Sequence, residues 1–274
     1  MDKVKTQNGH QEVVLITGCS SGLGRKLAME LKKRGYLVAA SARNVDSIKD
    51  LAVDMILELD VTDDRQITSG VQRVVERFGR IDMLVNNAGY SVRAAVEEID
   101  LEKLQQMFDV NVFGIIRMIQ AVAPYMRKQM QGKIINVGSV SGRLCGLVNG
   151  GYCASKHSFN AISESARYEL QSFGIQVTLL EPGAMDTDFF KTLSAKSDQA
   201  MKKQDSPYFQ LYSRDLAYRQ KQTRADIDVS VEEICRIISR KKLKTRYRIS
   251  LPFMFTLLIH MPDCIREKLI LKFN

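Results

Sequence analysis

The sequence has few of the residues that build metal centres and disulfide frameworks. Its 274 residues include five cysteines and three histidines. The cysteines form an odd, scattered set without metal-ligand spacing: Cys19, Cys145, Cys153, Cys235 and Cys264. The histidines, His10, His157 and His260, are equally dispersed. We therefore expect reduced thiols that serve mostly as small core residues, and a reaction that requires no metal.

The sequence also lacks the marks of an exported or membrane-spanning chain. Residues 1–12 are polar and mixed in charge, with no apolar signal core. The apolar run over residues 251–261 has about 11 residues, whereas crossing a bilayer takes about 20. We expect a cytoplasmic protein for which any membrane contact would be peripheral and weak.

The excess of basic over acidic residues lies in the last third of the chain. Residues 1–188 hold 22 Lys or Arg and 22 Asp or Glu, whereas residues 189–274 hold 18 and 9, which accounts for the whole net charge of +9. Six of these cations lie within residues 240–248, just before the apolar run. This segment fits either a final strand and helix packed on the core or a surface that rests on anionic lipid through residues 240–261. No recognition motif supports nucleic acid as a partner.

Apolar runs alternate with stretches of helical periodicity along most of the chain. Strands are expected at residues 13–17, 37–43, 55–59, 81–85, 133–137 and 175–180, and helices at 65–78, 101–130, 152–173 and 230–239. This alternation predicts an α/β fold: one Rossmann-like, doubly wound parallel sheet with helices on both faces. We expect a single domain over residues 1–274, with a cofactor and catalytic core (12–188), a substrate lid (189–228) and a basic and apolar C-terminal segment (229–274).

A glycine-rich turn joins the first expected strand to a helix. Gly18, Gly22 and Gly24 have a spacing of three residues and then one, unlike the commoner dinucleotide fingerprint. A strand, a glycine turn and a helix place backbone N–H groups and a helix N-terminus against an anion, and a pyrophosphate is the usual ligand.

The residue that ends the second strand distinguishes the two nicotinamide cofactors. An acid there accepts a hydrogen bond from the ribose 2′-hydroxyl, whereas an arginine suits a 2′-phosphate. Arg43 occupies this position, so NADP(H) is favoured over NAD(H). Ser20 would add a hydroxyl donor, and Asp60 would accept a hydrogen bond from the adenine amine.

Tyr152 and Lys156 stand four residues apart, which places them on one face of a helix. An ammonium group beside a phenol stabilises the phenolate and lowers its pKa toward neutrality, as a proton donor and acceptor requires. Ser139, thirteen residues earlier, lies within reach of a loop that returns beside the phenol. Asn111 lies inside an expected helix, where an asparagine is locally unfavourable and needs a reason.

These motifs together resemble the short-chain dehydrogenase/reductase family over about residues 12–190. The resemblance is carried by Thr17-Gly18-x3-Gly22-x-Gly24, Asn86-Asn87-Ala88-Gly89, Asn111, Ser139, Tyr152-x3-Lys156 and Pro182-Gly183-x3-Thr187. The stretches around Ser139 and Tyr152 are similar to the branch that contains hydroxysteroid and retinol dehydrogenases. Beyond about residue 190, where such enzymes select substrates, the resemblance thins.

The resemblance implies a role for each catalytic residue. Tyr152 would give or take the hydroxyl proton, Lys156 would lower its pKa and hold the nicotinamide ribose, and Ser139 would polarise the carbonyl. Asn111 would hold a water that links Lys156 to solvent. The residues implied to bind the cofactor are Gly18, Ser20, Ser21, Gly22, Leu23, Gly24, Arg43, Asp60, Val61, Asn87, Ala88, Gly89, Tyr152, Lys156, Pro182, Gly183, Met185 and Thr187.

Residues 189–228 mix aromatic and basic side chains without clean periodicity, which fits either a flap with an apolar underside or an ordinary packed subdomain. The residues expected to contact substrate are Ser139, Leu144, Leu147, Val148, Tyr152 and Phe189. We expect an enzyme that interconverts an alcohol and its carbonyl on a steroid, a retinoid or a long-chain lipid, as a homodimer or homotetramer. The alternatives are a reductase of acyl-chain or small polar ketones and a non-catalytic NADP(H)-sensing protein.

Overall fold

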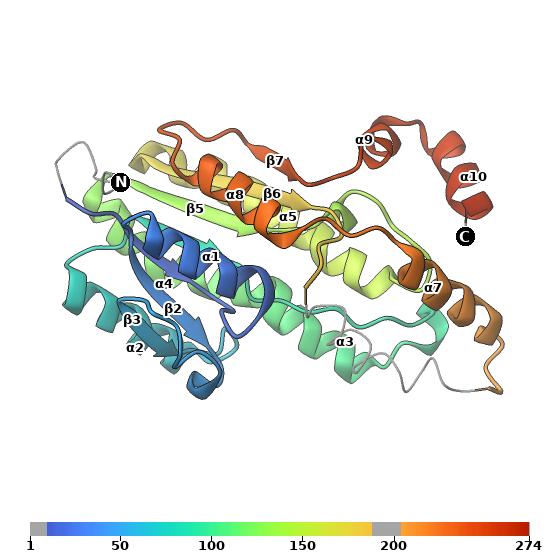
Figure 1. The fold of residues 1–274 in the computed structure, drawn as a ribbon, viewed down its shortest axis with the longest axis horizontal. Helices are drawn as coiled ribbons and strands as arrows, with labels where there is room; N and C mark the ends of the chain where they lie inside the picture. Colours follow the sequence, from blue (N-terminus) through green and yellow to red (C-terminus); the bar gives the residue numbers. More distant parts are fainter. Residues whose placement is uncertain (1–9, 188–203, 274) are drawn as a thin grey trace.

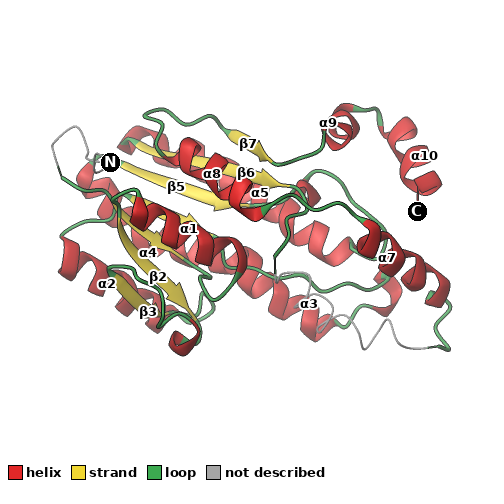
Figure 2. Ribbon diagram, in the orientation of Figure 1, coloured by secondary structure: helices red, strands yellow, loops and turns green. Residues whose placement is uncertain are grey.

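A computed structural model of the chain describes residues 10–187 and 204–273. It contains one parallel sheet with the strand order β3-β2-β1-β4-β5-β6-β7 (Figures 1 and 2). The strands are β1 (Val13–Ile16), β2 (Leu37–Ala42), β3 (Met55–Glu58), β4 (Met83–Asn86), β5 (Gly132–Val137), β6 (Ile175–Pro182) and β7 (Arg246–Ile249). All six expected strands are present, and β7 extends the sheet beside β6.

Helices cover both faces of this sheet, which confirms the predicted fold class. The main helices are α1 (Gly22–Lys33), α2 (Asp64–Phe78), α3 (Leu101–Phe108), α4 (Gly114–Gln129), α5 (Gly150–Leu170), α7 (Phe209–Lys221), α8 (Ile227–Ile238), α9 (Phe253–His260) and α10 (Asp263–Phe273). One apolar core joins the sheet to α1 and α8, and the other joins it to α2, α4 and α5.

Strand β1 shows how the sequence supplies both cores. Val14 and Ile16 point into the core under α1 and α8, whereas Val13 and Leu15 point into the core under α2 and α4. Successive side chains of a strand alternate between faces, so a strand covered on both sides must be apolar throughout. The unbroken apolar run of β1 is therefore the signature of a central parallel strand.

The long helix expected at residues 101–130 contains a break. A π-helical turn, Asp109–Phe113, separates α3 from α4. The combined stretch Leu101–Gln129 is long and apolar enough to cross a membrane, but 44% of the residues in the window are buried inside the protein. Burial against the sheet accounts for its apolar composition. Because π turns insert an extra residue into the helix, they commonly lie at functional sites.

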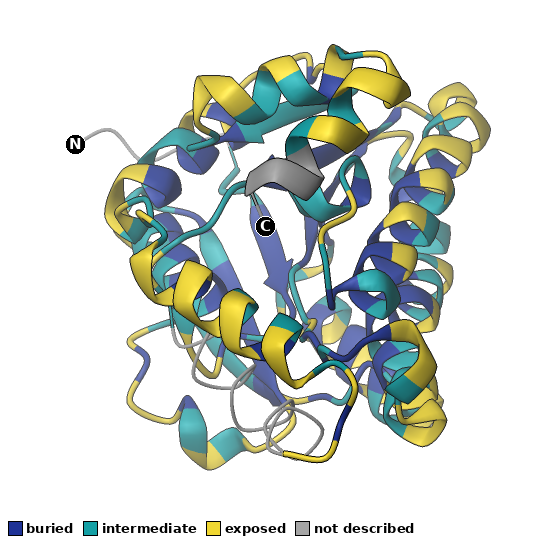
Figure 3. Cartoon of the chain, turned by 90° about the vertical axis from the view of Figure 1, so that its right-hand side faces the viewer, coloured by how far each residue is buried: buried dark blue, intermediate teal, exposed yellow. Residues whose placement is uncertain are grey.

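The C-terminal segment only partly matches the packed alternative. Strand β7 pairs with β6, as a final strand should. Helix α9 follows at the edge of the molecule and exposes three of its six apolar side chains; Ile259 is its buried residue. The basic and apolar segment therefore adds a strand to the sheet and leaves one side of an apolar helix exposed. Figure 3 shows the alternation of buried and exposed residues along the helices of the chain.

Candidate active site

The predicted site residues gather at the carboxyl ends of β1, β4, β5 and β6. The strand order reverses between β1 and β4, because β2 lies on one side of β1 and β4 on the other. In open α/β sheets, ligands bind in the crevice outside the strand ends at this switch point. Three predicted site residues come within two positions of a strand that ends at this crevice: Gly18 after β1, Asn87 after β4 and Ser139 after β5.

The glycine turn packs tightly against the loop after β4. Gly18 has φ +72°, and a Cβ atom there would lie 2.8 Å from the Cα of Ala88. A Cβ on Gly24 would lie 2.4 Å from the carbonyl oxygen of Gly18 and 2.4 Å from the side-chain Nδ2 of Asn87. Larger residues cannot occupy these positions without displacing backbone. The glycines therefore permit close loop packing, which fits the predicted dinucleotide turn.

Asn87 fixes these two loops to each other. Its side-chain Nδ2 donates hydrogen bonds to the carbonyl oxygens of Thr17 at 2.9 Å and Gly18 at 3.0 Å. In return, the Thr17 hydroxyl oxygen accepts hydrogen bonds from the backbone N–H groups of Asn87 and Ala88 at 3.0 and 3.1 Å. The structure thus shows Asn87 as a clamp between loops, in addition to any contact with a cofactor.

The surroundings of the turn suit a phosphorylated dinucleotide. Helix α1 begins at Gly22 and has no acidic residue in its first turn, so its N-terminus favours an anion. The hydroxyls of Ser20 and Ser21 are exposed beside it, and Arg43 is exposed at the end of β2. This donor set fits a pyrophosphate and a further phosphate.

Two other predicted cofactor segments lie at this edge. The Asp60 carboxylate accepts hydrogen bonds from the Thr62 N–H and hydroxyl at 2.9 and 2.8 Å, which closes the turn after β3 next to buried Val61. Thr187, beyond Pro182 and Gly183, lies against the glycine turn, since a Cβ on Gly22 would be 3.4 Å from the Thr187 Cβ. The segment that carries Met185 pairs with Ala225.

Tyr152 and Lys156 lie together in the first half of α5, as the spacing predicts. Both are buried, and the Lys156 Nζ lies 5.9 Å from the centre of the Tyr152 ring. Lys156 donates a hydrogen bond to the carbonyl oxygen of Val137 at 3.1 Å, and Ser139 hydrogen-bonds Tyr152. A Cβ on Gly89 would lie 3.9 Å from the Lys156 Nζ, so the pair faces the loop after β4.

The electrostatics of this pair differ from the expectation. Burial raises the pKa of Tyr152 above its usual range, while the Ser139 hydrogen bond and the Arg93 charge act in the opposite direction. Burial also lowers the pKa of Lys156 to about 8. Desolvation disfavours the charged forms of both groups. Among the influences that lower the pKa of Tyr152, the hydrogen bond from Ser139 is the largest.

Asn111 explains the π turn in the long helix. It is fully buried, and its Nδ2 donates hydrogen bonds to the Tyr90 carbonyl at 2.8 Å and the Ser155 hydroxyl at 3.2 Å. Its Oδ1 accepts a hydrogen bond from the Tyr90 N–H at 3.0 Å. The extra residue of the turn directs this amide inward, where it joins the loop after β4 to helix α5. The predicted water-holding role remains a prediction.

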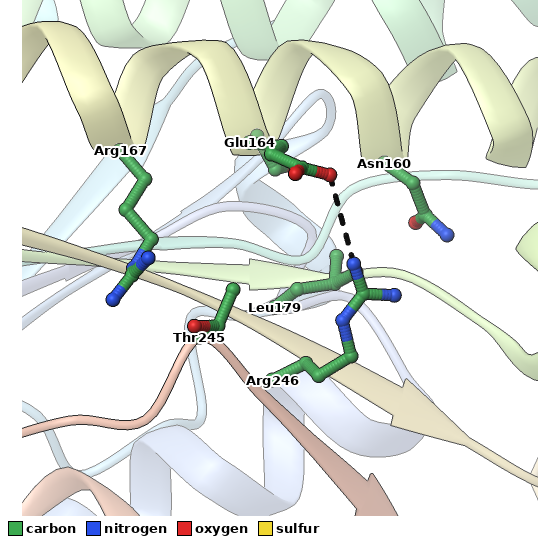
Figure 4. Close-up of a pocket in the computed structure, with 7 residues that line it drawn as sticks. Asn160, Glu164, Arg167, Leu179, Thr245 and Arg246 are labelled. Carbon is green, nitrogen blue, oxygen red and sulfur yellow. Dashed lines mark ion pairs between the residues drawn. The ribbon is translucent and has the colours of Figure 1, made fainter.

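The first asparagine of the Asn86-Asn87 pair lies behind the site. Asn86 donates a hydrogen bond to the Asn136 side chain at 2.9 Å, and Asn136 donates one to the Ser163 hydroxyl at 2.9 Å. Near this buried chain, a small cavity of about 10 Å³ lies between α5 and strands β6 and β7 (Figure 4). Its volume admits one water at most, so it is not a substrate pocket.

Helix α7 lies over the loops that carry the predicted substrate residues. The Tyr212 hydroxyl accepts a hydrogen bond from the Ala95 N–H at 3.0 Å and donates one to Glu98 at 2.7 Å. Val148 packs in one apolar cluster with Ala95 and Tyr212, so it supports α7 from below. Leu144 and Leu147 lie on the same loop and are half-buried, whereas Phe189 lies outside the described residues.

A buried ion pair that the sequence analysis missed links α7 to the site. The carboxylate of Asp215 on α7 lies 3.3 Å from the Arg93 guanidinium and 2.8 Å from the Arg219 guanidinium. All three side chains are largely buried: the exposed fraction is 14% for Arg93, 7% for Asp215 and 6% for Arg219. Arg93 also donates a hydrogen bond to the Leu147 carbonyl at 3.4 Å. The signal in the sequence was a lone arginine in the otherwise apolar stretch after Gly89.

Comparisons with known proteins agree with this geometry. The family model described as short chain dehydrogenase matches residues 12–198. The chain is 34% identical over 261 residues to an uncharacterized oxidoreductase, YusZ, of Bacillus subtilis, covering 91% of this chain and 92% of that protein. It is 32% identical over 244 residues to a 3-ketodihydrosphingosine reductase of Bacteroides thetaiotaomicron, covering 87% of each.

Solved structures show the same fold. A short-chain dehydrogenase from Streptomyces avermitilis superposes with a TM-score of 0.76 at 29% identity and covers 95% of each chain. A short chain dehydrogenase from Burkholderia cenocepacia, in complex with NADP, has a TM-score of 0.76 at 22% identity and covers 96% of this chain and 98% of its own. The second likeness is informative for the fold alone.

Proposed function

Since the chain belongs to the short-chain dehydrogenase family, we propose that it is an NADP(H)-dependent oxidoreductase that interconverts an alcohol and its carbonyl compound on a lipophilic substrate. The observation that carries the proposal is the group formed by buried Tyr152 and Lys156 and half-buried Ser139 at the carboxyl edge of the sheet. A hydroxyl donor and a phenol at the carboxyl edge of the sheet are suited to proton transfer with a substrate oxygen.

The cofactor supplies the hydride, and the chain supplies its binding and orientation. The glycine turn and the N-terminus of α1 would hold the pyrophosphate. Arg43, exposed at the end of β2 without an acid at the strand end, would bind the 2′-phosphate of NADP(H). Asp60, Gly89 and Thr187 would flank the adenine and nicotinamide ends.

Each catalytic residue has a role that its surroundings support. Tyr152 would hold and transfer the hydroxyl proton, and Ser139, which hydrogen-bonds it, would polarise the substrate oxygen. Lys156, held by the Val137 carbonyl, would keep a positive charge beside the phenol and hold the nicotinamide ribose. Asn111 positions the loop after β4 against α5.

A long-chain lipid ketone is the substrate class with the most support. The relative from Bacteroides thetaiotaomicron is a 3-ketodihydrosphingosine reductase, and it aligns over 87% of this chain. Helix α7 and the loop before α5 share an apolar cluster that contains Val148 and Tyr212. Steroids and retinoids, which the sequence motifs favour, have a similar apolar character. We also propose a cytoplasmic homodimer or homotetramer, which sedimentation velocity would test.

A turnover screen tests the proposal. Steroids, retinoids and long-chain ketones, including 3-ketodihydrosphingosine, should be incubated with NADPH and NADH in parallel. We expect turnover of a lipophilic ketone with NADPH, and a loss of at least about 100-fold in kcat with retained cofactor binding in Tyr152→Phe. A preference for NADH would contradict the role of Arg43, and full activity in Tyr152→Phe would contradict the catalytic assignment.

A further inference from the structure

The edge of the molecule at α9 and α10 exposes large apolar side chains. Four of the exposed large apolar side chains among the described residues lie on these two helices. Their exposed fractions are 80% for Phe253, 61% for Met254, 49% for Leu257 and 49% for Ile265. Phe253 has the highest exposed fraction of them all. Three of the four belong to α9, in which Ile259 is the buried residue. Exposed large apolar side chains gathered on one short helix are typical of an interaction site.

Helix α9 lies at the outer edge of the sheet. It follows β7, the last strand, and Figure 1 places it at the margin of the molecule. The guanidinium of Arg248 on β7 lies 2.7 Å from the His260 ring nitrogen, which ties the end of α9 to the edge strand. The apolar face is therefore held in place next to β7.

The same edge carries an unbalanced positive charge. Residues 234–262 contain seven Lys or Arg and no Asp or Glu. Arg246 forms ion pairs within the protein, with Glu181 at 3.0 Å and with Glu164 at 3.7 Å. Figure 4 shows the pair with Glu164. Lys241, Lys242 and Lys244 are exposed, and none of them forms an ion pair with a described residue.

We propose that this edge, formed by residues 240–248 and α9, docks on the surface of an anionic lipid bilayer. Phe253, Met254 and Leu257 would enter the boundary between headgroups and acyl chains, while the lysines contact lipid phosphates. Helix α9 has eight residues, or about 12 Å, so it lies on the bilayer and does not cross it.

Charge decides between a bilayer and a second copy of the chain. Two copies that met through this edge would bring two acid-free, basic segments together, and like charges that face each other destabilise an interface. An anionic bilayer neutralises the lysines and also accepts the apolar face. A nucleic acid would neutralise the charge but would leave Phe253 and its neighbours in water. The bilayer alone matches both properties of the edge.

The docking surface lies toward the same end of the molecule as helix α7. Helices α7 and α9 both lie toward the end of the molecule at which the strands finish (Figure 1). Helix α7 also exposes Phe209, Leu216 and Tyr218, at 38%, 43% and 44%. If the proposed lipophilic substrate is correct, docking would allow it to enter from the bilayer, but docking itself does not depend on turnover.

Co-flotation of the full chain with vesicles tests the docking without any enzymatic readout. We expect binding to vesicles of equal parts phosphatidylglycerol and phosphatidylcholine, little binding to pure phosphatidylcholine, and release at high salt. The triple variant F253S/M254S/L257S and the triple variant K241E/K242E/K244E should each weaken binding by at least about tenfold. Absence of binding to the anionic vesicles would overturn the proposal.

Control variants test whether any loss of exposed apolar surface or of positive charge weakens vesicle binding. V229S/Y168S removes two exposed apolar side chains on α8 and α5, and K33E/K49E/K128E reverses three exposed charges within residues 33–128. Both should bind vesicles like the wild type. If the α9 variant instead turns a dimer into a monomer in sedimentation, while the wild type ignores vesicles, a second copy covers this face and the proposal is wrong. Failure of the turnover screen would leave the docking result unchanged.

Discussion

The two parts of the chain solve the problem of charge in different ways. Residues 1–188 balance their charges in number, and Asn87 and Asn111 among their site residues are held in hydrogen-bonded networks. Residues 189–274 carry the whole excess of nine positive charges, and described residues among them expose both cations and apolar side chains. The first part is thus suited to hold a cofactor in a fixed geometry, and the second carries the surface that we propose to dock on lipid.

The buried carboxylate of Asp215 joins the two parts through its ion pair with Arg93. Replacing Asp215 by asparagine should lower the free energy of unfolding by about 3–5 kcal/mol, because Arg93 and Arg219 would stay buried without their carboxylate. The substrate KM should rise at the same time, since α7 would lose its anchor. Denaturant unfolding and steady-state kinetics measure the two effects.

The surface pair of Asp263 and Arg266 is the matched control. Asp263 is 91% exposed, so Asp263→Asn should change the free energy of unfolding by less than about 0.5 kcal/mol. Equal effects of the two asparagine variants would show that burial does not strengthen the link between α7 and the core.

The glycine turn is the next most sensitive point, and it lies wholly in the first part. Gly24→Ala would place a Cβ 2.4 Å from the Gly18 carbonyl oxygen, so we expect a loss of about 3 kcal/mol in the free energy of unfolding, and weaker cofactor binding. Gly146→Ala is the control, because no atom lies within 4 Å of its Cβ position. Similar unfolding curves for the two variants would contradict the tight packing of the loops.

Lys156 should make stability depend on pH. Burial lowers its pKa to about 8 in the folded chain, from an ordinary value of 10.5, so the unfolded chain binds more protons between these values. The stability of the wild type relative to Lys156→Met should therefore rise from about pH 8 to about pH 10.5, by roughly 1–3 kcal/mol. Parallel stability curves of the two proteins over this window would refute the burial of the charge.

The sequence predicted the elements and motifs well where local pattern and tertiary structure agree. The parallel sheet follows from the strand–helix alternation, and Tyr152 and Lys156 meet because one helix carries both. The π turn was not predictable, because the need for Asn111 to reach Tyr90 and Ser155 arises from packing. The sequence predicted a lowered pKa for Tyr152, whereas burial raises it. The spacing of Tyr152 and Lys156 shows that they are neighbours, but only the fold shows how deeply they are buried.

The link through Arg93 and Asp215 lay beyond the reach of sequence patterns. These residues are 122 positions apart, and the pairing depends on how α7 returns over the loop after β4. The sequence alone fits two positions for α9, because an apolar run of this length suits either a helix packed on the core or a helix on the surface. Only its position beyond the edge strand distinguishes them.

The smallest effect on stability should come from the most apolar surface. Phe253→Ser should change the free energy of unfolding by less than about 0.5 kcal/mol, because the side chain is 80% exposed and removes little buried area. Ile234→Ala on α8, a fully buried residue of the core, should cost about 2–4 kcal/mol in the same denaturant titration. A large loss in Phe253→Ser would mean that α9 packs against the protein, and the contrast between an inward-facing first part and an outward-facing last part would fail at this helix.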